Sequence, residues 1–64
     1  MLSRREGQVL QLIAEGKSIR PIATLLGIAD KTAEHHREHI RRKLGVRTTA
    51  HLVRWAIRME LVVP

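Results

Sequence analysis

The 64-residue chain has no cysteine, no tyrosine and no phenylalanine, and Trp55 is its only aromatic residue. Without cysteine, neither a disulfide framework nor a thiolate metal site can hold the fold together. With one aromatic side chain, the chain lacks the stacking platform on which single-stranded nucleic acids bind. No apolar run is long enough for a membrane span or a signal peptide, so we expect no membrane association and a reducing, cytoplasmic location.

Acidic residues are also scarce. Six Asp and Glu residues stand against twelve Lys and Arg residues, which gives a net charge of +6 and a pI near 11.5. Such an excess in so short a chain favours a polyanionic partner. The length suffices for one small core, so we expect residues 1–64 to form a single all-α domain.

Residues 19–38 predict two short helices that meet at a tight turn. Ile22, Leu25 and Leu26 are spaced as the apolar face of the first helix. Gly27 follows, where the end of a helix favours a residue that tolerates positive φ. This order of apolar, small and glycine residues is the pattern of a helix-turn-helix.

Capping signals predict where the first two helices begin. Ser3 and Glu6 form an S-x-x-E capping box, so the first helix is expected over residues 4–14. Ser18 is expected to cap the second helix.

Similar signals predict the third and fourth helices. Asp30 is expected to cap the third helix, over residues 31–44. Thr48 or Thr49 is expected to cap a fourth helix over residues 49–60. The apolar face of that helix and the residues after it are expected to complete the core: Leu52, Val53, Ala56, Ile57, Leu61 and Val62.

Basic residues cluster around the predicted helix-turn-helix and the end of the third helix. A run of charges is usually only a solvated face, but this excess has one sign and surrounds a helix with a polar outer face. Ser18 adds a hydroxyl and free amides at a helix N-terminus, which suit a phosphate. We expect phosphate contacts from Lys17, Ser18, Arg20, Lys31, Thr32, Arg37, Arg41 and Lys43.

Three residues on the outer face of the third helix are best placed for base edges: Glu34, His35 and Glu38. A carboxylate there can accept a hydrogen bond from the amino group of cytosine in the major groove. Each acid has a second interpretation, in which it pairs with Arg41 or Arg42. We favour base contact for Glu34 and ion pairing for Glu38.

The histidines suggest a competing chemistry. His35, Glu38 and His39 match H-x-x-E-H, in which two histidines bind zinc and the glutamate activates water. Such a site needs a third protein ligand and a substrate cleft, and a domain of this size has little room for either. We therefore predict no metal, no cofactor and no enzyme activity. We expect His35 to face outward, towards a ligand, and His36 to pack at the edge of the core.

The predicted fourth helix carries a ridge at i, i+4 and i+8, formed by His51, Trp55 and Met59. Its inward stripe is already filled, so an outward Trp–Met pair suggests a partner surface. We expect this ridge to form a homodimer interface.

Several motifs, taken together, are specific: Leu2-Ser3-Arg4-Arg5-Glu6, Val9-Leu10, Leu12-Ile13-Ala14-Glu15-Gly16-Lys17-Ser18, Ile22-Ala23, Leu26-Gly27-Ile28, Thr32-Ala33-Glu34-His35-His36, Lys43-Leu44-Gly45-Val46, His51-Leu52-Val53 and Ala56-Ile57. On these motifs the chain resembles the LuxR-type DNA-binding domain of NarL/FixJ response regulators and quorum-sensing receptors. The resemblance implies a four-helix helix-turn-helix domain that binds double-stranded DNA to regulate transcription. It further implies a third helix in the major groove, dimerisation through the fourth helix, and an upstream regulatory domain.

Two other functions remain open at this stage. A sigma-factor-like promoter-binding domain has a similar helix-turn-helix but accounts poorly for the match over the whole chain. A protein interaction module would use the fourth helix without binding DNA.

Overall fold

The computed structural model describes residues 2–59. These residues contain four α-helices and no β-strand, which confirms the all-α class. The third helix starts one residue earlier than expected, and the fourth ends at Arg58. The predicted core residues Leu61 and Val62 lie outside the described residues. The helices are α1 Arg4–Ala14, α2 Ile19–Leu26, α3 Asp30–Leu44 and α4 Thr49–Arg58.

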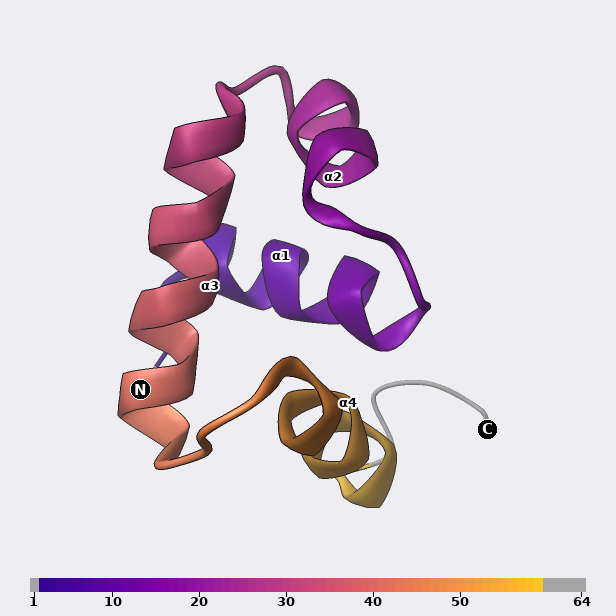
Figure 1. The fold of residues 1–64 in the computed structure, drawn as a ribbon, viewed down its shortest axis with the longest axis vertical. Helices are drawn as coiled ribbons and strands as arrows, with labels where there is room; N and C mark the ends of the chain where they lie inside the picture. The colour runs from indigo at the N-terminus through magenta and orange to yellow at the C-terminus, as the bar shows by residue number, and fades with distance from the viewer. Residues whose placement is uncertain (1, 60–64) are drawn as a thin grey trace.

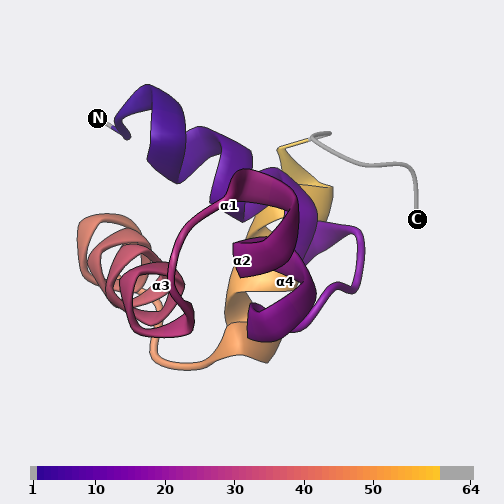
Figure 2. The ribbon, with the colours of Figure 1, turned by 90° about the horizontal axis from the view of Figure 1, so that it is seen from above.

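Helix α1 occupies the centre of the domain and contacts the other three helices. Figure 1 shows α1 crossing between α2 above and α4 below, with α3 running along one side. From above, α3 again stands beside the stack of the other helices (Figure 2). Because α3 also packs on α2, the pair forms the helix-turn-helix, and its outer side stays uncovered.

The core is aliphatic, as the lack of aromatic residues requires. Residues from all four helices share one cluster: Val9, Leu10, Ile13, Ile22, Ala23, Ala33, Ile40, Leu52 and Ala56. Ala33 is fully buried on α3 and Ala23 almost fully on α2, so two small side chains lie where these helices pack.

The structure corrects the expected inner face of α2. Leu25 is 62% exposed, whereas Ile22 and Ala23 are buried. Successive residues of a helix are about 100° apart, so burial of Ala23 beside Ile22 turns the inner face away from Leu25. The prediction that Leu25 faces the core is therefore wrong.

The helix ends follow the capping signals in part. Ser3 and Glu6 form the expected capping box, and Thr48 accepts a hydrogen bond of 3.1 Å from the His51 amide. Ser18 occupies the N-cap position of α2, but its side chain makes no cap hydrogen bond. Asp30 is the first residue of α3 rather than its cap, because Ala29 takes the cap position. The cap predicted for Asp30 is therefore wrong, whereas Ser18 takes the cap position as predicted.

None of the described helices is both long and apolar enough to cross a membrane.

Candidate nucleic-acid interface

The turn between α2 and α3 fixes how α3 projects from the domain. Gly27 ends α2 in the left-handed conformation, at φ 67° and ψ 36°. The Ile28 amide then donates to the Ala23 carbonyl at 3.0 Å, and Ile28 packs against the core. A non-glycine residue would be strained at this φ, so Gly27 permits a turn this tight.

Helix α3 has one buried side and one polar, exposed side. Ala33 and Ile40 are fully buried, and they anchor the helix over most of its length. The first two turns carry an exposed polar surface that consists of Lys31, Thr32, Glu34 and His35. Among the described residues, Glu34 has no ion-pair or hydrogen-bond partner, so its carboxylate is available to a ligand.

The predicted phosphate contacts of α2 lie beside this surface. Lys17, Ser18 and Arg20 are all exposed at the start of α2. The Ser18 hydroxyl is not used as a helix cap, which leaves it available to a ligand. Arg20 Nε lies 3.5 Å from Asp30 Oδ2, and this exposed ion pair joins α2 to the first turn of α3.

The last turns of α3 are organised around Glu38. Its carboxylate accepts a hydrogen bond from Arg41, and its Oε2 lies 3.6 Å from Arg42 Nε. Arg41 also donates to the backbone carbonyl of Arg47 in the turn before α4. These contacts match the ion-pairing interpretation of Glu38. The guanidinium of Arg41, which is one of the predicted phosphate contacts, is therefore already bonded within the domain.

A buried carboxylate connects α1 with the end of α3. Glu6 is 4% exposed, and its Oε1 accepts hydrogen bonds from Lys43 Nζ at 2.7 Å and from the Ser3 amide at 2.9 Å. His39 Nδ1 lies 3.9 Å from Oε2. The hydrogen bond from Lys43, followed by that from the Ser3 backbone, lowers the pKa of Glu6 from 4.5 to about 2. Lys43, another predicted phosphate contact, therefore holds α1 and α3 together.

The S-x-x-E pattern predicts only the capping role of Glu6. The signal for its second role lies in the spacing of α1, because Glu6 shares one helical face with Val9, Leu10 and Ile13. All four of these residues are buried. An acidic residue on an apolar face indicates that a basic side chain from elsewhere comes to meet it.

The remaining basic and histidine candidates lie around the polar surface of α3. Arg37 and His36 are half-buried at its margin, and His39 is exposed. Among residues 2–59, no group of three or more His, Asp or Glu side chains is arranged to hold a metal ion. Within that part of the chain, no third ligand stands beside the H-x-x-E-H string.

The ridge on α4 is less exposed than expected. His51 is exposed and Met59 is 55% exposed, but Trp55 is half-buried and packs against the core. A large indole reaches the core even from the edge of a helix, so Trp55 does not point fully outward as predicted. Only part of its surface remains for a partner.

Comparison with known proteins settles the family. Residues 1–56 match the family described as "Bacterial regulatory proteins, luxR family". This chain belongs to the LuxR family. The LuxR-type match covers α1 to α3 and most of α4, and the family consists of DNA-binding domains of transcriptional regulators, not of enzymes.

Curated relatives agree with this assignment. The chain is 48% identical over 56 residues to the transcriptional regulatory protein MctR of Rhizobium johnstonii, which covers 88% of this chain and 26% of that protein. It is 45% identical over 58 residues to the uncharacterized response regulatory protein YgeK of Escherichia coli K12, and the match covers 91% of this chain and 40% of that protein. It is 40% identical over 62 residues to the oxygen regulatory protein NreC of Staphylococcus aureus, and the match covers 97% of this chain and 29% of that protein. This LuxR-type chain thus spans about a quarter to two-fifths of these proteins.

The buried Glu6 of this LuxR-type domain predicts how stability depends on pH. A folded pKa of about 2 against 4.5 unfolded stabilises the fold by about 3 kcal/mol at pH values well above 4.5. Because the folded pKa is the lower one, this contribution is lost as the pH falls from about 5 towards 2. Urea denaturation across this range should therefore show falling stability.

Two variants separate Glu6 from the other acids in that experiment. Glu6→Gln should flatten the pH dependence, whereas Glu34→Gln, at an exposed carboxylate, should leave it unchanged. Lys43→Met should cost about 2 kcal/mol at neutral pH, because it removes a charged hydrogen bond from a buried carboxylate. An unchanged pH profile in Glu6→Gln would contradict the assignment.

Proposed function

We propose that α3 is the recognition helix of a sequence-specific regulator and enters the major groove of double-stranded DNA, while α2 lies across the backbone. The observation that carries this proposal is the exposed polar surface of α3, which lies opposite Ala33 and Ile40 and beside a net positive charge. DNA-binding proteins of this type present such a surface to base edges.

The proposed phosphate contacts fall into two groups. Lys17, Ser18, Lys31 and Thr32 are exposed at the helix-turn-helix and bind phosphates directly. Arg20 and Arg37 border the same surface and add further contacts. Arg41 and Lys43 are bound by Glu38 and Glu6, so their main role is to hold the end of α3 in place, with their charge adding to the attraction.

The proposed base contacts are Glu34 and His35. Both are exposed on the first two turns of α3, the part of a recognition helix that reads base edges. Glu38 is less suited to this role, because Arg41 and Arg42 already occupy its carboxylate.

The domain is further proposed to act as a homodimer on DNA in the cytoplasm, under the control of an upstream regulatory domain. Support for the larger protein comes from the relatives, two of which are named as a response regulatory protein and an oxygen regulatory protein. Met59 and His51 offer an exposed ridge for a second copy. Arginines border this ridge and oppose pairing of free domains, so we expect dimers only where DNA phosphates offset that charge.

The first prediction concerns the electrostatic anchor. The affinity for double-stranded DNA should fall with salt at a log–log slope of about −3 to −6 per monomer if several phosphates are contacted. Lys31→Ala should reduce the slope by about 1 and weaken binding to all sequences alike. Arg5→Ala, at an exposed residue of α1, is the matched control. Fluorescence anisotropy across a salt series measures both, and a salt-independent affinity would refute the proposal.

The second prediction concerns sequence readout by Glu34. Glu34→Ala should relax the preference at one C·G pair by about 1–3 kcal/mol, measured on a site selected from random duplexes and on its single-base variants. Glu38→Ala is the matched acid one turn away and should instead weaken binding to every variant. If Glu34→Ala raises affinity uniformly, Glu34 only repels phosphate and His35 carries the specificity.

The third prediction concerns dimerisation. Because Trp55 contributes to the core, Met59 is the better residue to test. Met59→Ser should reduce cooperative occupation of a duplex with two half-sites and spare a single half-site. Leu25→Ser removes a comparable exposed apolar side chain outside the ridge and should leave cooperativity intact. If Met59→Ser weakens binding equally to the duplex with two half-sites and to the single half-site, the ridge is not the interface.

A further inference from the structure

The ion pair between Arg20 and Asp30 joins the two helices of the helix-turn-helix across their turn. Arg20 is the second residue of α2, and Asp30 is the first residue of α3, at the upper end of that helix in Figure 1. Arg20 Nε donates to Asp30 Oδ2 at 3.5 Å, and the two side chains are 86% and 48% exposed. The residues are ten positions apart in the chain, so the turn brings them together.

The backbone of the turn fixes where Asp30 lies relative to α2. Gly27 ends α2 in the left-handed conformation, and the amide of Ile28 bonds back to that helix. Ala29 takes the cap position of α3, so the Asp30 carboxylate meets Arg20 instead of capping its own helix. Asp30 therefore presents an acceptor to Arg20 from a place that the fold determines.

The contact occupies one edge of the Arg20 guanidinium and leaves the other edge for a ligand. Nε faces Asp30, whereas two further N–H groups, on Nη1 and Nη2, can bind a phosphate through parallel hydrogen bonds. Because so exposed a side chain has few other restraints, the ion pair determines where its head group lies. It holds that group beside the first turn of α3, where Lys31 and Thr32 are also exposed.

We propose that Asp30 is a positioning residue for DNA binding, which holds Arg20 so that its free edge meets a phosphate beside the start of α3. The inference rests on the proposed entry of α3 into the major groove and adds an acidic residue to the parts that bind phosphate. Its distinctive consequence is a change of sign. Asp30 strengthens binding while Arg20 is present and weakens binding when Arg20 is absent.

The sizes of two opposing effects give this change of sign. Ordering a flexible arginine on binding weakens affinity by about two- to tenfold, and a side chain that is already held avoids part of that loss. Repulsion between the Asp30 carboxylate and a phosphate about 7 Å away is reduced by water and salt to about twofold. Positioning is therefore the larger effect with Arg20 in place, and only the repulsion remains without it.

The experiment is a double-mutant cycle on the affinity of the 64-residue chain for a duplex with a single half-site, selected from random duplexes. Asp30→Asn should weaken binding about threefold in the unmodified chain and strengthen it about twofold in Arg20→Ala. Asp30→Glu keeps a carboxylate within reach of Arg20 and should stay within about twofold of the unmodified chain. Urea denaturation of each variant measures any change in stability separately.

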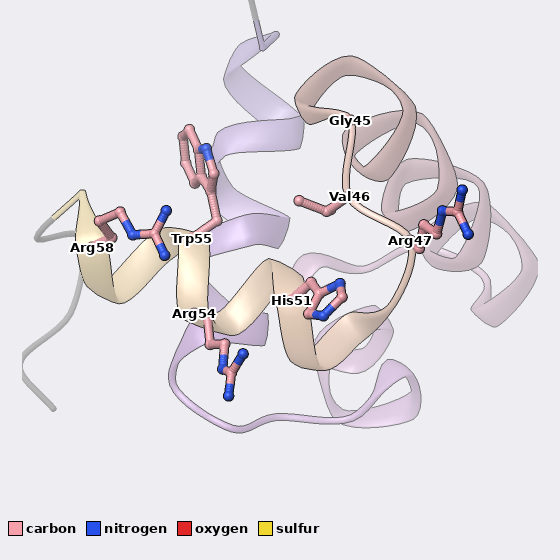
Figure 3. Close-up of a pocket in the computed structure, with 7 residues that line it drawn as sticks. All are labelled: Gly45, Val46, Arg47, His51, Arg54, Trp55 and Arg58. Atoms are coloured by element: carbon pink, nitrogen blue, oxygen red, sulfur yellow. The ribbon is translucent and has the colours of Figure 1, made fainter.

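Arg58→Ala is the matched control for the loss of one positive charge. Figure 3 shows Arg58 at one end of α4 and Arg47 in the turn at the other end. Since Asp30 pairs with Arg20, Asp30→Asn should weaken binding by the same factor in Arg58→Ala as in the unmodified chain.

The ion pair is also tested without DNA. Nuclear Overhauser measurements on the Arg20 Nε–H group report motion of the side chain on the picosecond to nanosecond timescale. The group should be more mobile in Asp30→Asn than in the unmodified chain, because the tether is gone.

Three results would overturn the inference. A gain of affinity for Asp30→Asn with and without Arg20 would mean that Asp30 only repels phosphate. A loss in both, with lower stability in urea, would mean that Asp30 serves only the start of α3, where an acid interacts favourably with the helix dipole. Equal mobility of the Arg20 Nε–H group in the two proteins would exclude the tether. In each case the unmodified chain still binds DNA, whereas a chain that shows no salt-dependent binding would refute the proposed function itself.

Discussion

The ion pair between the buried Glu6 and the more exposed Lys43 is the constraint on which the position of α3 depends. One oxygen of Glu6 closes the capping box of α1 through Ser3 and also accepts the hydrogen bond from Lys43. The start of α1 and the end of α3 are therefore held by the same atom. Breaking this pair leaves the Glu6 carboxylate charged in a poorly solvated place, so the contact resists loosening.

This contact matters because α3 is held differently at its two ends. At the start, Gly27 permits the tight turn and Ile28 packs into the core, so backbone geometry fixes the helix there. About 20 Å further along, Lys43 fixes the other end through charge. Between the two, Ala33 and Ile40 allow α3 to lie flat on α1 and α2. The polar surface of α3 is thus presented by a helix that is fixed along its whole length.

The sequence predicted those features that depend on neighbours along the chain. The capping box needs only Ser3 and Glu6, and the end of α2 needs only Gly27, so local chemistry decides both. Leu25 is more exposed and Trp55 more buried than the sequence predicts, because the packing of a second helix decides which side of α2 and α4 is buried. Local spacing gives the width of an apolar face, but tertiary contacts decide its direction.

For the charged residues, too, the sequence predicts local contacts and misses tertiary ones. Ion pairing of Glu38 with Arg41 and Arg42 follows from spacing on one helix, and the sequence indicated it. The partner of Glu6 is 37 residues away, so no local pattern reveals that Lys43 serves the fold. A count of basic residues therefore overstates the charge that is available to ligands.

How the acids are paired determines where that available charge remains. Asp30, Glu38 and Glu6 neutralise Arg20, Arg41, Arg42 and Lys43, all of which lie on α2 or α3. Cations without such a partner among the described residues remain on α1, beside the first turns of α3 and on α4. Charge that is not neutralised within a fold lowers its stability through self-repulsion, unless a ligand offsets it. The proposed DNA contact would offset the charge beside the first turns of α3 in this way.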